Sequence, residues 1–104
     1  MNFVENRKPS GNLINIRVQH IGIENLIRLI SNVPYAAVVS VAKSWPAPNN
    51  EAARFRIGKC EFVIETSFAD MFIAPSPDKI PSEEFETLAQ HLRIAKEKYQ
   101  DSLP

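Results

Sequence analysis

The sequence is poor in the residues on which most enzyme chemistry depends: its 104 residues include three glycines, two histidines and one cysteine. Gly11, Gly22 and Gly58 are too far apart to form a phosphate-binding loop or a dinucleotide fingerprint, both of which need closely spaced glycines. A serine nucleophile elbow is also missing from the sequence. We therefore expect no catalytic residue and no cofactor, and a binding role is favoured over an enzymatic one.

A metal site is equally unsupported by the sequence. Zinc needs about four nitrogen, sulfur or oxygen ligands, and His20, Cys60 and His91 would have to converge from three separate elements. Cys60 is instead interpreted as a small buried apolar side chain. Three glutamates at positions 83, 84 and 86 are explained by the electrostatics of a helix N-terminus.

The charges of the chain cancel, with 12 basic and 12 acidic side chains. A nucleic-acid-binding protein usually has a basic excess, because neutralisation of phosphates drives its affinity. The longest apolar run, Val33 to Ala42, is too short to cross a membrane and contains Pro34 and Ser40. We expect neither nucleic acid nor membrane as a partner.

A lone cysteine allows no intramolecular disulfide, which fits a reducing compartment. The first 11 residues are polar and lack the apolar segment of a secretory signal. The cytoplasm is therefore the expected location. The length and a hydrophobic share of 44% predict a single domain over residues 1–104, with residues 1–12 as a polar lead-in that ends in a turn.

Periodicity predicts the first elements. Leu13 to Gln19 alternates apolar and polar residues, which is typical of a half-buried strand. From Ile23 the apolar spacing becomes that of a helix, which ends at Asn32 and Pro34. The valines between Tyr35 and Lys43 predict a strand that is covered on both faces or lies near the centre of the sheet.

A hairpin is predicted around Gly58 and Lys59, a pair that suits a two-residue type II′ turn. In this register Ile57, Phe55 and Ala53 face Cys60, Phe62 and Ile64 on one side of the sheet. Arg56 faces Glu61 and Arg54 faces Val63 on the other side. A slip of one residue would mix the two faces, so the register is well defined.

The rest of the chain predicts one more strand over Ser67 to Ala74 and a final helix. Ser82 is a suitable N-cap for this helix. Its expected buried stripe consists of Phe85, Leu88, Ala89, Leu92, Ala95 and Tyr99.

The order of these elements predicts an α+β two-layer sandwich, with two helices on one face of a single sheet of four to five strands. The sheet should be mainly antiparallel. It would be mixed if the two strands joined by the first helix were neighbours, since that crossover would make them parallel.

The function predicted from these observations is protein binding. Such a chain could be a small accessory, inhibitor or immunity-type protein that acts by occluding a partner, or it could form a homodimer through a sheet edge. The candidate contact residues are Trp45, Arg54, Arg56, Glu61, Glu65, Phe68 and Phe72. The alternative is a small enzyme or ligand-binding domain with a pocket between the sheet and the helices.

Overall fold

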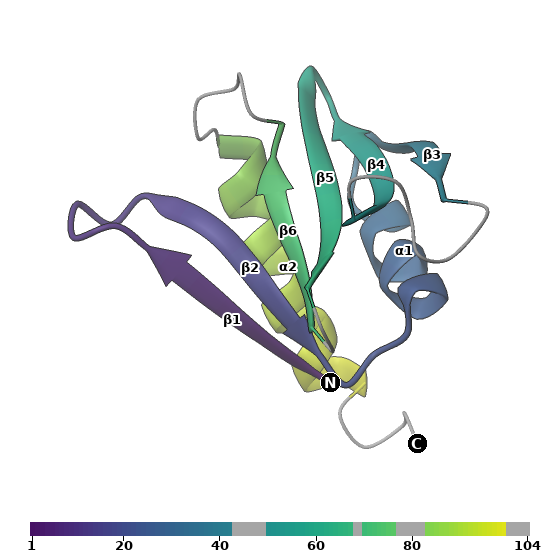
Figure 1. Cartoon of the computed structure of the whole chain (residues 1–104). Coiled ribbons are helices and arrows are strands. Elements are labelled where there is room, and N and C mark those ends of the chain that lie inside the picture. Colours follow the sequence, from purple (N-terminus) through teal and green to yellow (C-terminus); the bar gives the residue numbers. More distant parts are fainter. Residues whose placement is uncertain (43–49, 68–69, 77–82, 100–104) are drawn as a thin grey trace.

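The computed structural model describes residues 1–42, 50–67, 70–76 and 83–99, in which one six-stranded antiparallel sheet packs against two helices (Figure 1). The elements in chain order are β1 (Asn2–Arg7), β2 (Leu13–Gln19), α1 (Ile23–Ser31), β3 (Ala36–Val41), β4 (Glu51–Ile57), β5 (Cys60–Ser67), β6 (Asp70–Pro75) and α2 (Glu83–Tyr99). Both helices lie behind the sheet in Figure 1 and contact each other. This arrangement confirms the predicted α+β sandwich.

The strand order is β1-β2-β6-β5-β4-β3, and every neighbouring pair is antiparallel. The sheet therefore has six strands and not the predicted four to five. The mixed alternative is also wrong, because β2 and β3 are not neighbours. Helix α1 carries the chain from the second strand of the sheet to its far edge, past three strands that are added later in the sequence.

Strand β1 corrects the prediction of a lead-in over residues 1–12. It pairs along its whole length with β2, and Phe3 lies opposite Val18. Its side facing the helices carries Phe3, Glu5 and Arg7, of which two are charged. A strand with this composition has no apolar alternation, so periodicity could not detect it.

Strand β3 exists where the valines predict it, but its predicted position is wrong. Among the described residues it forms an edge of the sheet and pairs with β4 alone. Five of its six residues are exposed. Nothing within a charge-free run of small and β-branched residues distinguishes an edge strand from a buried one.

The core lies between the helices and one face of the sheet. The rings of Phe55 and Phe62 stack at 5.3 Å, and Phe85 of α2 packs on Phe62 at the same centroid distance. The predicted helix stripe is buried from Phe85 to Ala95. Ser82 and the side chain of Tyr99 fall outside the described residues.

The hairpin of β4 and β5 has the predicted register, with Ile57 opposite Cys60 and Phe55 opposite Phe62. Gly58 has a φ of 60°, and Lys59 is not among the residues with positive φ, as a type II′ turn requires. The register and the turn type predicted from the sequence therefore both agree with the structure of this hairpin.

Candidate functional site

The face of the sheet that points away from the helices, here called the open face, brings together the predicted contact residues that the structure describes. Arg54 and Arg56 come from β4, Glu61 and Glu65 from β5, and Phe72 from β6. Their side alternates with that of buried Phe55, Phe62 and Ile64, which point toward the helices. Trp45 and Phe68 lie outside the described residues, so their predicted roles stay predictions.

Arg54 on the open face contacts two carboxylates. Its Nη2 lies 2.6 Å from Glu51 Oε1, and its Nη1 lies 3.5 Å from Glu61 Oε2. The hydrogen bond to Glu51 is the main reason why the pKa of Arg54 lies above its ordinary value. The arginine is thus shared between two carboxylates and has little freedom to meet a third.

Arg56 is placed differently, although it lies directly opposite Glu61 in the register. Glu61 forms its ion pair with Arg54, its diagonal neighbour, because a long arginine side chain reaches across a strand pair at that spacing. Within the described parts of the chain, no ion pair involves Arg56, and the residue is exposed. Arg56, on the strand next to the β3 edge, is therefore the β4 arginine that is available to a partner.

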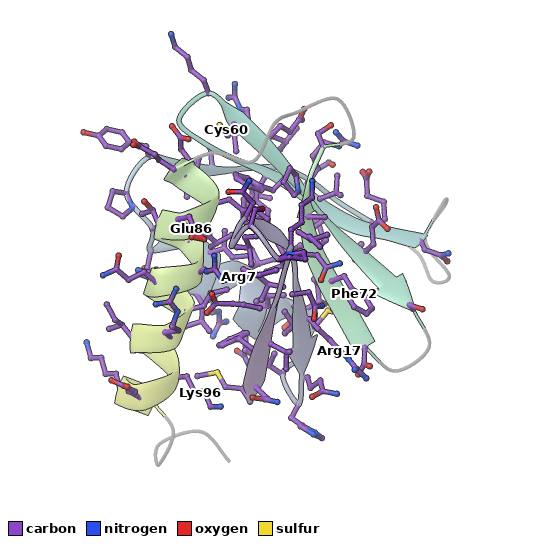
Figure 2. All side chains as sticks on the ribbon, turned by 90° about the vertical axis from the view of Figure 1, so that its left-hand side faces the viewer. Arg7, Arg17, Cys60, Phe72, Glu86 and Lys96 are labelled. Carbon is purple, nitrogen blue, oxygen red and sulfur yellow. The ribbon has the colours of Figure 1, made fainter. Side chains whose placement is uncertain are left out.

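Phe72 lies at the middle of the open face, opposite Arg17 on β2 and Glu65 on β5. It is half-buried, and Arg17 lies beside it in Figure 2. Arg17 donates a hydrogen bond from Nε to Asp70 Oδ2 at 2.8 Å. An aromatic ring bordered by charges of both signs is a suitable centre for a polar protein contact.

Val63 shows that not every side chain on the open face is exposed to solvent. It faces away from the helices, between Arg54 and Ala74 in the register, yet it is only 3% exposed. Long side chains such as Arg54 can cover an apolar neighbour with their aliphatic stems while the charged group stays in water. The open face therefore includes an apolar side chain that is buried among its charged neighbours.

The β3 edge borders the open face and carries the largest group of exposed apolar side chains in the described residues. Tyr35 is 88% exposed, and Val38, Val39 and Val41 are 41%, 48% and 46% exposed. The strand AAVVSV contains no charge and no proline, which are the usual means of protecting an edge. Its one irregularity is a bulge at Val39, where the pairing with β4 shifts by a residue.

The opposite edge, β1, is protected by charge. Glu5 accepts a hydrogen bond from Arg93 at 2.6 Å, and Arg7 donates one to Glu86 at 2.6 Å. Figure 2 shows Arg7 and Glu86 pointing toward each other between β1 and α2. The two edges of one sheet thus differ: β1 is charged and tied to a helix, whereas β3 is apolar and open.

Tyr35 leads into β3 in an unusual backbone conformation, with a φ of 65°. Positive φ is uncommon for a bulky residue other than glycine. Its carbonyl accepts a hydrogen bond from the Gly58 amide at 3.1 Å, which ties this residue to the hairpin turn. The exposed ring is therefore carried on a fixed piece of backbone at one end of the β3 edge.

The described part of the chain has surface hollows beside α2. The first, about 510 Å³, lies between the β1–β2 turn and the beginning of α2, and its polar lining includes Asn12, Glu83 and Gln90. The second, about 370 Å³, lies between α1 and α2 and is lined by Leu29, His91 and Ile94 among others. The first lining also includes Glu86 and Thr87, and the second also includes Lys98.

The three residues considered as metal ligands lie apart. His20 is exposed at the end of β2, His91 lies on α2, and Cys60 donates a hydrogen bond to Glu84 Oε2 at 3.3 Å. In the described ranges, no three histidine, cysteine or acidic side chains are close enough to hold a metal. No helix of those ranges is long and apolar enough to cross a membrane.

The residues of the β3 edge were not predicted as contact residues. Their only sequence signal is a charge-free run after a helix, which the sheet centre would equally produce. Comparison of the chain with protein-family models, curated proteins and solved structures gives no match.

Proposed function

We propose that this chain is a protein-binding domain, and that its contact surface is the β3 edge together with the neighbouring part of the open face. The observation that carries this proposal is the exposure of a charge-free edge strand. An edge strand presents unpaired backbone N–H and C=O groups that can accept a further strand. Tyr35 and three valines add apolar surface along the same edge.

Binding at this edge would cover a segment of a partner. The chain would then act as an accessory, inhibitor or immunity-type protein by occlusion, and its partner would be another protein or a second copy of itself. Arg54, Arg56, Glu61, Glu65 and Phe72 would contact those parts of the partner that extend over the open face. Charges of both signs on this face favour selective recognition over tight binding.

The cytoplasm is the proposed location. The one cysteine, Cys60, is a free thiol, and the fold is held by a buried apolar core without a disulfide. Such a chain suits a reducing compartment.

The test uses the same substitution at both edges of the sheet. Val39→Lys places a charge on the β3 edge, and Val4→Lys is the matched control on β1, where the valine is 38% exposed. Both tagged variants and the wild type are used for affinity purification from cells of the native host, followed by mass spectrometry and size-exclusion chromatography. Circular dichroism checks that both variants are folded.

A protein, or a second copy of the chain, that is retained by the wild type and by Val4→Lys but lost from Val39→Lys supports the proposal. If the two variants retain the same proteins and have the same oligomeric state as the wild type, the β3 edge is not the binding surface.

A further inference from the structure

We infer that the segment bound at the β3 edge is an extended strand in which an acidic residue alternates with apolar residues. This inference rests on the proposed function, because it names the class of partner for the same edge. It follows from which side chains would flank an added strand on each of its two sides.

The helix side of the edge is apolar. Val38 lies opposite Phe55 and Val41 opposite Ala53, so both valines point toward the side of the helices. They are 41% and 46% exposed because the core ends beside them. Residues of an added strand on this side would extend the core by covering both valines, which favours apolar side chains there.

On the open-face side of the edge, β3 carries small side chains, and an arginine of β4 lies beside each of them. Ala37 lies opposite Arg56, and Ser40 lies opposite Arg54. Neighbouring strands are about 4.8 Å apart, so an added strand would lie about 10 Å from β4. The methyl group of Ala37 does not obstruct this path, and a glutamate on the added strand and the Arg56 side chain can meet above it.

Charge complementarity selects an acid at this position. Arg54 is already shared by Glu51 and Glu61, whereas Arg56 is exposed and makes no ion pair with any described residue. A basic side chain beside Ala37 would be repelled. The bulge at Val39 interrupts the regular alternation of side chains between Ala37 and Ser40. The preference for an acidic residue in the added strand therefore applies at the position beside Ala37.

A second copy of the chain fits this pattern less well. Two β3 strands paired about a two-fold axis would place only neutral side chains of the segment AAVVSV beside each other. Arg56 would then remain without a carboxylate from the added strand. We therefore assign the edge to a partner segment with an acidic residue, and self-association is an outcome that the experiment can detect.

The probes are two blocked, fluorescently labelled peptides of about eight residues, the length of an ordinary strand. One alternates valine with glutamate and the other alternates valine with lysine. Fluorescence anisotropy measures their binding to the wild type, Arg56→Glu, Val39→Lys and the charge control Lys8→Glu. Lys8 is exposed in the turn between β1 and β2, at the far edge of the sheet.

We expect the glutamate peptide to bind the wild type and Lys8→Glu about threefold or more tightly than the lysine peptide, as an exposed ion pair allows. Arg56→Glu reverses this preference, and Val39→Lys, which adds a positive charge to the edge, weakens the binding of the lysine peptide. Equal binding of the two peptides, or a preference that Arg56→Glu does not change, overturns the inference.

Two further outcomes separate the inference from the proposed function. A wild-type dimer that Val39→Lys dissociates in sedimentation would make a second copy the occupant, which overturns the inference but supports the proposed edge. If neither peptide binds while Val39→Lys still loses a partner in the purification, the acidic segment is wrong and the edge remains the binding surface.

Discussion

Glu5 Oε2 accepts a hydrogen bond from Arg93 Nε at 2.6 Å, and this contact joins the first strand of the chain to its last helix. Arg7 extends the connection, because it donates to Glu5 Oε1 at 2.5 Å and to Glu86 Oε1 at 2.6 Å. Partial burial raises the pKa of Glu5, but the hydrogen bonds from Arg93 and Arg7 outweigh that effect and hold it below its ordinary value. A polar strand is thus fixed to the domain by charge.

The lowered pKa of Glu5 predicts a pH-dependent contribution to stability. As the pH falls, the unfolded chain binds this proton first, at an ordinary glutamate pKa of about 4.3. The contribution is therefore fully present above that pH and is lost as the pH falls through the lower pKa of the folded state. We expect Glu5→Gln to reduce the free energy of unfolding by about 1 kcal/mol at pH 7 and by less at pH 3.

Urea unfolding across this pH range measures the difference between wild type and variant. Glu65→Gln is the control, since Glu65 is exposed and no ion pair joins it to another described residue. If the difference between Glu5→Gln and wild type were constant with pH, Glu5 would not be the titrating group.

Replacing Gly58 should change the stability of the domain through backbone strain alone, without steric clashes. Its φ is 60°, and a Cβ built on it would meet no atom within 4 Å. Gly58→Ala should therefore lower the free energy of unfolding by about 1–2 kcal/mol, because an L side chain is strained at positive φ. Gly58→Asn should also destabilise the hairpin, because asparagine tolerates the left-handed helical region whereas the first central position of a type II′ turn favours glycine. Thermal unfolding measures both, and equal stability of the alanine variant and the wild type would contradict the turn geometry.

Substitution of Gly22 should raise the free energy of unfolding, in contrast to substitution of Gly58. It is the N-cap of α1, with a φ of −76° and no side-chain hydrogen bond to the helix. A serine fits this conformation and can accept a hydrogen bond from a free amide of the first turn, so Gly22→Ser should stabilise the domain by about 0.5 kcal/mol. Gly22→Ala is the control, because it changes the backbone freedom in the same direction without adding a cap. If serine were no better than alanine in chemical denaturation, the cap would not form.

The sequence predicts the register of the β4–β5 hairpin and the buried stripe of α2 from Phe85 to Ala95 residue by residue. Both are local features: the two faces of the hairpin admit one register around Gly58, and the stripe follows helical spacing from Phe85. The candidate contact residues Arg54, Arg56, Glu61 and Glu65 share the open face for the same reason, since alternation in paired strands places them together.

Two strands could not be placed from the sequence. β1 is stabilised by Glu5 and Arg7, whose partners lie near the far end of the chain. Charges that serve as long-range contacts look like an ordinary polar segment when read along the sequence. β3 is apolar, and its position depends on where β4, β5 and β6 pair, which is decided by segments that follow it.

The sequence by itself determined the class of the fold, the hairpin register and both helices, because each of these depends on residues a few positions apart. Only the tertiary structure decided that Val38, Val39 and Val41 are exposed on an edge and that Arg56 is left without an ion pair in the described residues. Edge position and charge pairing depend on which distant strands become neighbours. No local period encodes that choice, because long-range pairing is selected by the energy of the whole sheet.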